Sequence, residues 1–228
     1  GALEKILKID PAQKNLLRRF LTVGRILLEK AEQEYQIPLE VDKGFDFRIG
    51  RLRHRILDGI ADRYNLKNYD KNGDAIQKLR QVISAYELIV LNYPDPSLPI
   101  LNDDEKDWML RETLTAFDFI VIKKDYLVSN PTPERFFEWL TRFETYVYRR
   151  KPRMIGGEPS ILPRTAHVRF APAFDLSDYY DDYKKKKKAT VEKVTERLRN
   201  DIAGLLHGME DLTGPIVEPF DVGEDAID

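Results

Sequence analysis

Cysteine is absent from this chain of 228 residues, and histidine is scarce. Without cysteine the chain can form neither disulfides nor thiolate metal sites. The three histidines, His54, His167 and His207, are too few for a histidine-based metal site. We therefore predict no metal centre built on sulfur or imidazole.

A long apolar run is lacking as well. The longest stretch without charge, around residues 88–102, is interrupted by Asp95 and by three prolines. A helix that crosses a bilayer needs about 20 consecutive apolar residues, so no segment of this chain is expected to span a membrane. The N-terminus carries no signal-peptide pattern, and it begins Gly1-Ala2-Leu3 without an initiator Met. We therefore expect the chain to be cut from a longer protein.

Basic residues are missing from one part of the chain. Residues 209–228 hold seven acids and no Lys or Arg, which leaves 32 acids against 37 bases in residues 1–208, while the whole chain has a net charge of -2. This balance argues against nucleic-acid binding. With 42% hydrophobic and 33% charged residues, the chain can bury one sizeable core. We predict a single helical domain over residues 1–208, followed by an acidic tail over residues 209–228.

Apolar side chains recur at helical spacing through most of the chain, which predicts a mainly α fold. Asp10, Asn102 and Thr132 are expected to cap three of these helices, and Asn102 begins a capping box that Glu105 completes. The pattern indicates a multi-helix bundle of about six helices, over residues 10–35, 47–64, 76–90, 102–127, 132–147 and from about 177 to 205.

One short strand is predicted at residues 165–170, where polar and apolar side chains alternate. An isolated strand leaves unpaired backbone groups, so it needs a partner. Three partners are open: residues 215–220 of the same chain, the strand edge of a second copy in a homodimer, or a sheet in a part of the protein outside this chain.

The segment that follows the predicted strand resembles the closing segment of bacterial phospholipid/glycerol acyltransferases of the lysophosphatidate acyltransferase kind. The turn reads Phe170-Ala171-Pro172-Ala173-Phe174-Asp175 and leads into a charged helix. Residues 2–7, 16–28 and 130–135 also resemble the helical extension that precedes this segment in a subgroup of that family. The likeness covers nearly the whole chain except the acidic tail.

The resemblance implies a catalytic His-x-x-x-x-Asp motif, which this chain does not contain. The segments His54 to Asp58 and His207 to Asp211 each have one residue too few between the two side chains. On a helix, such a pair four residues apart is an ordinary surface contact. We therefore assign no catalytic residue and no cofactor to this chain.

What the resemblance implies instead is a non-catalytic C-terminal accessory domain of a glycerolipid acyltransferase. The intact enzyme would transfer an acyl group from acyl-CoA or acyl carrier protein to glycerol 3-phosphate or lysophosphatidate. The main partner would be the missing N-terminal catalytic domain. We expect a cytoplasmic location, with the inner face of the membrane as an alternative. A free-standing helical interaction module, or a peripheral membrane-binding module, stays open as a different function.

Two basic clusters are candidates for binding an anionic headgroup or a phosphate. A cationic cluster near an anionic membrane contributes about 1 kcal/mol per Lys or Arg. A solvated helical face, balanced by Asp178, Asp181 and Asp182, is the simpler interpretation of the lysine run. The candidate residues are Lys184, Lys185, Lys186, Lys187, Lys188, Arg149, Arg150 and Arg153.

An acidic loop at residues 70–74 is a possible calcium loop by composition only. Its glycine, Gly73, is fourth where a calcium loop has it sixth, and its twelfth position is Gln81 where such a loop has Glu. A turn is the simpler interpretation.

Overall fold

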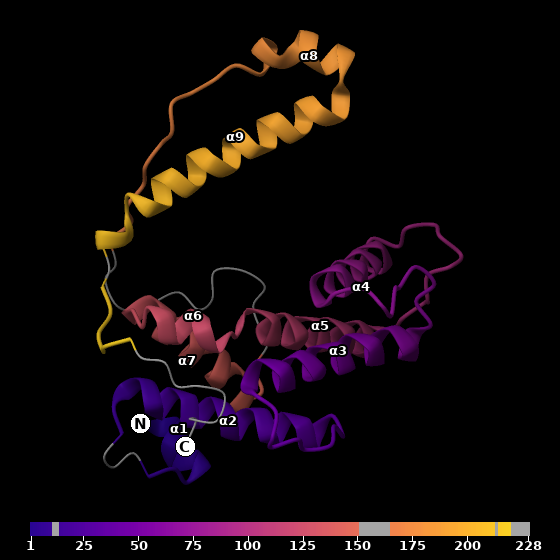
Figure 1. The fold of residues 1–228 in the computed structure, drawn as a ribbon. Helices are drawn as coiled ribbons and strands as arrows, with labels where there is room; N and C mark the ends of the chain where they lie inside the picture. The colour runs from indigo at the N-terminus through magenta and orange to yellow at the C-terminus, as the bar shows by residue number, and fades with distance from the viewer. Residues whose placement is uncertain (11–13, 151–164, 213, 220–228) are drawn as a thin grey trace. The chain divides into compact units, whose positions relative to one another are not determined.

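The computed structural model describes residues 1–10, 14–150, 165–212 and 214–219, and most of them are helical (Figure 1). Nine α-helices lie in the described ranges, more than the six predicted, because α1, α6 and α8 are short helices of six residues each. The helices are α1 (Ala2–Leu7), α2 (Leu16–Glu34), α3 (Phe45–Tyr64), α4 (Ala75–Val90), α5 (Asp103–Val121), α6 (Lys124–Ser129), α7 (Pro133–Val147), α8 (Tyr180–Lys185) and α9 (Lys187–His207). Two 3-10 helices, η1 (Leu176–Tyr179) and η2 (Glu210–Leu212), complete the secondary structure of these ranges.

The chain divides into two compact units, which are described separately. Unit 1 comprises residues 1–159 and 215–228, and unit 2 comprises residues 160–214. Within unit 1, Ile216 donates its backbone N–H to the Pro131 carbonyl at 3.0 Å, and Val217 packs against the core. The single domain over residues 1–208 and the tail boundary at residue 209 stay predictions.

Helix α3 packs against α2, α4 and α5, and its apolar stripe forms the centre of the core of unit 1. This stripe consists of Ile49, Leu52, Ile56, Leu57 and Ile60, which are all buried. Burying a side chain of this size stabilises the fold by about 1.5–3 kcal/mol. Aromatic contacts join α7 to both α2 and α3: the Phe136 ring of α7 lies 4.8 Å from Phe20 of α2, and the Trp139 ring of α7 lies 6.2 Å from Phe45 of α3.

The predicted caps of α5 and α7 are confirmed, and that of α2 is corrected. The Asn102 side chain accepts a hydrogen bond from the Glu105 N–H, and the Glu105 carboxylate accepts one from the Asn102 N–H, both at 3.0 Å. Thr132 caps α7 through the N–H of Arg135. Helix α2 begins at Leu16 and is capped by Asn15, which accepts from the Arg18 N–H at 2.9 Å; a cap at Asp10 is therefore wrong.

A buried ion pair joins α2 to α3. Arg48 donates to both carboxylate oxygens of Glu32, at 3.1 and 2.6 Å, and the two side chains are only 6% and 1% exposed. Two parallel bonds satisfy both oxygens of the acid, which a buried charge requires. The pair therefore fixes how α2 and α3 are set against each other.

In unit 2, the predicted strand at residues 165–170 is not formed. The segment carries no ladder to any described residue, and Val168 and Phe170 are 70% and 87% exposed. Figure 1 draws it as a plain trace that leads to η1 and α8. Alternation alone does not make a strand, because the backbone groups need a neighbouring strand to accept and donate hydrogen bonds.

The last predicted helix is interrupted inside the lysine run. Lys186 lies between α8 and α9 with φ -143° and ψ 70°, outside the helical region. Like charges in consecutive helical turns repel, and the break at Lys186 leaves two lysines of the run in α8 and two in α9. Throughout the part of the chain that the structure describes, no helix is long and apolar enough to cross a membrane.

Candidate ligand-binding cavity

A cavity of about 550 Å³ lies within unit 1, between α2, α3, α5 and α7. This volume falls in the range of roughly 300–1,000 Å³ that is usual for small-molecule sites. It is lined by Gly24, Leu27, Leu28, Glu34, Tyr35, Phe45, Ile49, Trp108, Arg111, Glu112, Thr115, Asp118, Phe119, Ile122, Arg142, Phe143, Thr145, Tyr146, Arg149 and Arg150.

The floor of the cavity is apolar. Its aliphatic and aromatic lining residues belong to the core of unit 1, and each is 7% exposed or less: Leu27, Leu28, Phe45, Ile49, Phe119, Ile122 and Phe143. Gly24 opens space beside them, because a Cβ at that position would meet the Phe143 ring at 3.2 Å. A ligand on this floor would exchange water contacts for contacts with side chains that are already packed.

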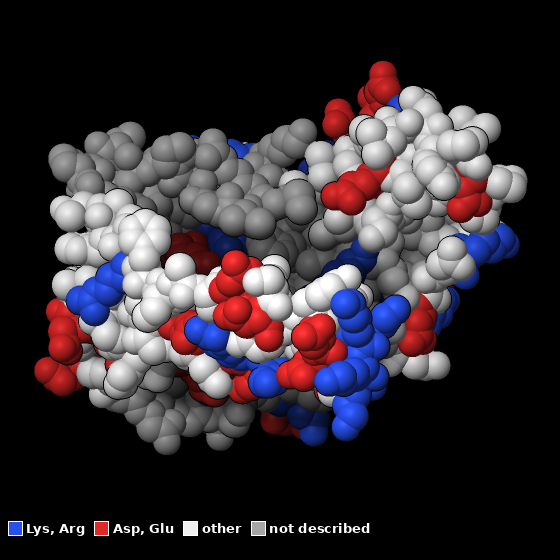
Figure 2. All heavy atoms as spheres, turned by 90° about the horizontal axis from the view of Figure 1, so that it is seen from above, with Lys and Arg blue, Asp and Glu red and all other residues white. Residues whose placement is uncertain are grey.

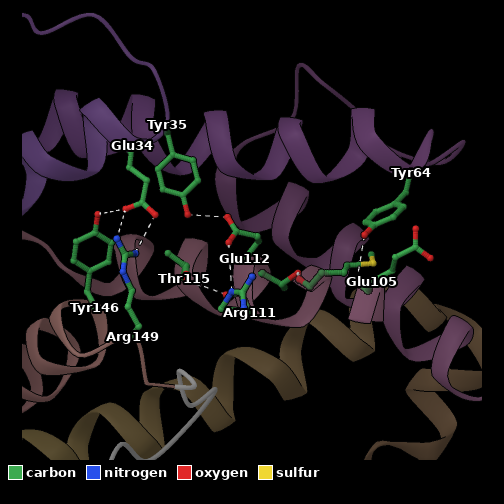
Figure 3. Close-up of polar contacts among 11 residues, drawn as sticks. Glu34, Tyr35, Tyr64, Glu105, Arg111, Glu112, Thr115, Tyr146 and Arg149 are labelled. Atoms are coloured by element: carbon green, nitrogen blue, oxygen red, sulfur yellow. Dashed lines mark hydrogen bonds and ion pairs between the residues drawn. The ribbon is translucent and has the colours of Figure 1, made fainter. Parts of the chain in front are cut away.

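A polar network on one side of the cavity joins the end of α2 to the end of α7 (Figure 3). Arg149 donates to both oxygens of Glu34 at 3.0 and 2.8 Å, and the Tyr146 hydroxyl donates to Glu34 at 2.8 Å. Burial raises the pKa of Glu34, but the bonds from Arg149 and Tyr146 outweigh it and leave this pKa below its ordinary value. Glu34 is therefore a carboxylate whose oxygens are already occupied.

A second polar contact joins α2 to α5. The Tyr35 hydroxyl donates to Glu112 at 2.7 Å, as Figure 3 shows. Burial raises the pKa of Glu112, and the bond from Tyr35 offsets only part of that rise. Burial, together with the Glu112 charge, also raises the pKa of Tyr35 far above its ordinary value. The tyrosine thus stays a hydrogen-bond donor at any physiological pH.

A third acid, Asp118 of α5, is paired with Arg142 of α7. Arg142 also donates to Glu138 at 3.0 Å. Burial raises the pKa of Asp118 to about 6, more than the neighbouring Arg142 lowers it. Because a charge in this position costs desolvation free energy, Asp118 holds a proton more readily than an exposed aspartate does.

Two cations on the lining are held less closely than Arg142 and Arg149. Arg111 forms only a long ion pair, 3.9 Å from its Nε to Glu112, and its side chain is 55% exposed. Arg150 makes no ion pair with a described residue, and its guanidinium lies 5.0 Å from the centre of the Tyr148 ring. The three acids of the lining are satisfied by partners, so the electrostatic excess of the cavity is positive.

The structure brings part of one predicted cluster to this cavity. Arg149 and Arg150 both line it, Arg149 through its bond to Glu34, whereas Arg153 lies outside the described residues. Sequence analysis did not identify Tyr35, Glu112, Asp118 or Arg142 as site residues. Each of them is a polar side chain on the inward face of an amphipathic helix. Such a residue can be recognised as a site residue only once the structure shows which face of the helix points inward.

The lysine run lies in unit 2 and forms a corner between two helices. Lys184 lies 3.9 Å from Asp181, and Lys188 lies 4.0 Å from Glu192, whereas Lys185 and Lys186 make no ion pair with a described residue. Lys184 also lies 4.1 Å from the centre of the Tyr180 ring. On the face drawn in Figure 2, basic and acidic side chains lie next to one another. Of the three predicted balancing acids, only Asp181 pairs with a described lysine of the run, and Asp182 pairs with Lys193 outside it.

The two histidine segments that lack the catalytic spacing contain ordinary contacts. Asp58 accepts hydrogen bonds from Lys78 at 2.8 Å and from Tyr69 at 2.6 Å. His207 lies 3.0 Å from Glu210. Among the described residues, no hydrogen bond or ion pair joins His54 to Asp58 or His207 to Asp211, so the expected pairs four residues apart are not formed.

Comparison with known proteins adds no identification. No family model, curated protein or solved structure matches this chain.

Proposed function

We propose that this chain is the non-catalytic C-terminal accessory part of a glycerolipid acyltransferase, and that residues 165–207 complete the fold of its catalytic domain. The observation that carries the proposal is the open apolar surface of unit 2. Val168 and Phe170 are 70% and 87% exposed, and α9 leaves Val191, Ile202 and Leu206 between 53% and 58% exposed. Contiguous exposed apolar side chains mark a surface that another element covers.

The chemistry of the extended segment suits an edge strand. In extended backbone, alternate side chains share one face, so Ala166, Val168 and Phe170 would lie together on one side and His167 and Arg169 on the other. An edge of a sheet would supply the missing backbone partners and bury the apolar face. The resemblance to the closing segment of the acyltransferase family supports such a sheet as the partner.

The experiment uses the polypeptide encoded upstream together with this chain. We expect the upstream sequence to contain a His-x-x-x-x-Asp motif, and the joined protein to transfer acyl groups from acyl-CoA or acyl carrier protein to lysophosphatidate or glycerol 3-phosphate. The 228-residue chain alone should show no transfer. Acyl transfer by the isolated chain, or an upstream sequence without the motif, would contradict the proposal.

Substitutions on the extended segment test the strand itself. Val168→Asp with Phe170→Asp should lower acyl transfer by the joined protein at least tenfold, which is a loss of about 1.4 kcal/mol or more. In the isolated chain the same change should leave thermal stability unaltered, since both side chains face water. Thr165→Asp, at another exposed position of the segment, is the matched control.

A second candidate function is peripheral binding to anionic membranes through the lysine run. Lys185 and Lys186, which form no ion pair with a described residue, favour it, together with the exposed Tyr180 and Tyr183 beside them. Tyrosine suits the interface between headgroups and acyl chains because one end of the ring is apolar. Sedimentation with anionic and with neutral liposomes, at low and high salt, decides it, and binding without an anionic preference would contradict this function.

A further inference from the structure

The cavity of unit 1 combines an apolar floor with two loosely held cations: Arg111 lies 3.9 Å from Glu112, and Arg150 makes no ion pair with a described residue. All of its described lining belongs to unit 1, whereas the exposed apolar surface behind the proposed function belongs to unit 2. A ligand of this cavity is therefore independent of that function.

The floor selects for an apolar body. Leu28 and Ile49 are 2% exposed, and the rings of Phe119 and Phe143 lie on the same lining. None of these side chains offers a hydrogen bond, so a polar group placed against them would lose its water without compensation. A hydrocarbon chain loses nothing by this transfer, and each buried CH₂ group contributes about 0.8 kcal/mol.

The polar side of the cavity selects for one negative charge. A cationic ligand would have to compete with Arg149 for Glu34, or with Arg142 for Asp118, and both acids are already bonded. The third acid, Glu112, accepts the hydroxyl of Tyr35. Arg111 and Arg150 are the cations that remain, and a guanidinium binds a carboxylate or phosphate through paired N–H donors.

We propose that this cavity binds a single-chain amphiphile, with its hydrocarbon chain on the apolar floor and its anionic end at Arg111 and Arg150. The shared chemistry is one chain ending in one anionic group. Two sources provide it, a free fatty acid and a single-chain phospholipid such as lysophosphatidate.

The test follows binding through a residue of the lining. Trp108 lines the cavity, and Trp139 is the only other tryptophan of the chain. A fatty acid that carries bromine at mid-chain quenches tryptophan at contact range. Titrating it into the 228-residue chain should give saturable quenching, and Trp108→Phe should remove most of it. Absence of saturable quenching would overturn the proposal.

Charge reversal separates the head from the chain. Arg111→Glu and Arg150→Glu should each weaken oleate binding about tenfold, or about 1.4 kcal/mol, and change binding of the neutral monooleoyl glycerol by less than about twofold. Lys67→Glu, an exposed residue of unit 1 away from the cavity, is the matched control and should leave both affinities unchanged. Equal loss for the acid and the neutral lipid would contradict a role of these arginines at the head.

The wild-type chain provides an independent measurement that needs no variant to fold. Oleate should bind at least about tenfold more tightly than monooleoyl glycerol. Rising ionic strength should reduce this difference in affinity, because salt screens the attraction between the carboxylate and the arginines. Lysophosphatidate with the same acyl chain as oleate distinguishes the two sources. Whichever of oleate and lysophosphatidate binds with the higher affinity is the better match to the cavity. A neutral lipid that binds as tightly as both acids would overturn the proposal, and acyl transfer plays no part in this outcome.

Discussion

The buried pair of Glu32 and Arg48 allows a quantitative test of how α2 is held against α3. Arg48→Met removes the cation and leaves a carboxylate that is 1% exposed without its two donors. Breaking such a pair from one side costs about 3–5 kcal/mol, because the remaining charge stays desolvated. A domain of ordinary stability unfolds at a cost of about 5–15 kcal/mol, so this single change should remove a large fraction of it.

The double variant Glu32→Leu with Arg48→Met should behave differently. With both charges replaced by apolar side chains of similar length, no desolvation penalty remains, and the free energy of unfolding should return to within about 1 kcal/mol of the wild-type value or exceed it. Urea titrations of the wild type, both single variants and the double variant, with separate fits of midpoint and slope, give the coupling energy.

Two outcomes of this cycle would refute the reasoning. If Arg48→Met costs less than about 1 kcal/mol, Glu32 must regain water or a new partner, and the pair does not fix the two helices. If the double variant is as unstable as the single one, the bidentate geometry contributes more than its desolvation costs. Either result would be visible in the urea midpoints, without any functional assay.

Further predictions concern a cap, a core ring and a buried acid. Asn102→Ala removes the capping box of α5 and should lower the free energy of unfolding by about 1 kcal/mol in a urea titration. Trp139→Ala should cost about 3–5 kcal/mol by the same measurement, because the side chain is 1% exposed, whereas Trp139→Phe should cost less. Asp118 has a folded pKa of about 6 against an ordinary value of 3.8, so its contribution to stability is fully present below pH 3.8 and is lost as the pH rises through 6. Asp118→Asn should remove this pH-dependent contribution to stability, which is at most about 3 kcal/mol. The difference in melting temperature between variant and wild type should therefore change between pH 3.8 and 6 and stay constant outside this range.

Much of unit 1 could be predicted from local patterns. The stripe of α3 is regular enough to give its buried face directly, and the caps at Asn102 and Thr132 depend on residues three positions apart. These signals lie within one helical turn or one helix, where the chain itself fixes the geometry.

The face of α5 shows where such patterns fail. The sequence pattern suggests an inward stripe of Trp108, Leu110, Leu114, Phe117 and Val121, yet only Leu114 of these is buried. The rest of the buried apolar face is formed by Met109, Thr113, Ala116 and Phe119. Apolar residues occur on more than one side of this helix, and Thr113 buries its hydroxyl by bonding to the Met109 carbonyl at 2.6 Å. A polar residue whose hydroxyl bonds to its own helix can be buried, although its polarity suggests an exposed position when only the sequence is read.

The cavity could not be predicted for a related reason. Its polar lining comes from residues far apart in the chain, as in the bond of Tyr35 to Glu112 across 77 positions and that of Arg149 to Glu34 across 115. No spacing rule connects such residues, because their proximity follows from how α2, α5 and α7 pack. The sequence showed the basic cluster at residues 149–150, but not the acids that it meets.

Both tryptophans of the chain, Trp108 and Trp139, belong to unit 1, whereas the aromatic side chains of residues 165–212 are phenylalanines and tyrosines. Tryptophan emission therefore follows the melting of unit 1 alone, while the helical circular dichroism signal also contains the 21 residues of α9. Two unfolding curves recorded from one sample would coincide only if both units melt as a single cooperative system. The placement of two side chains thus gives an optical measure of whether the units unfold together.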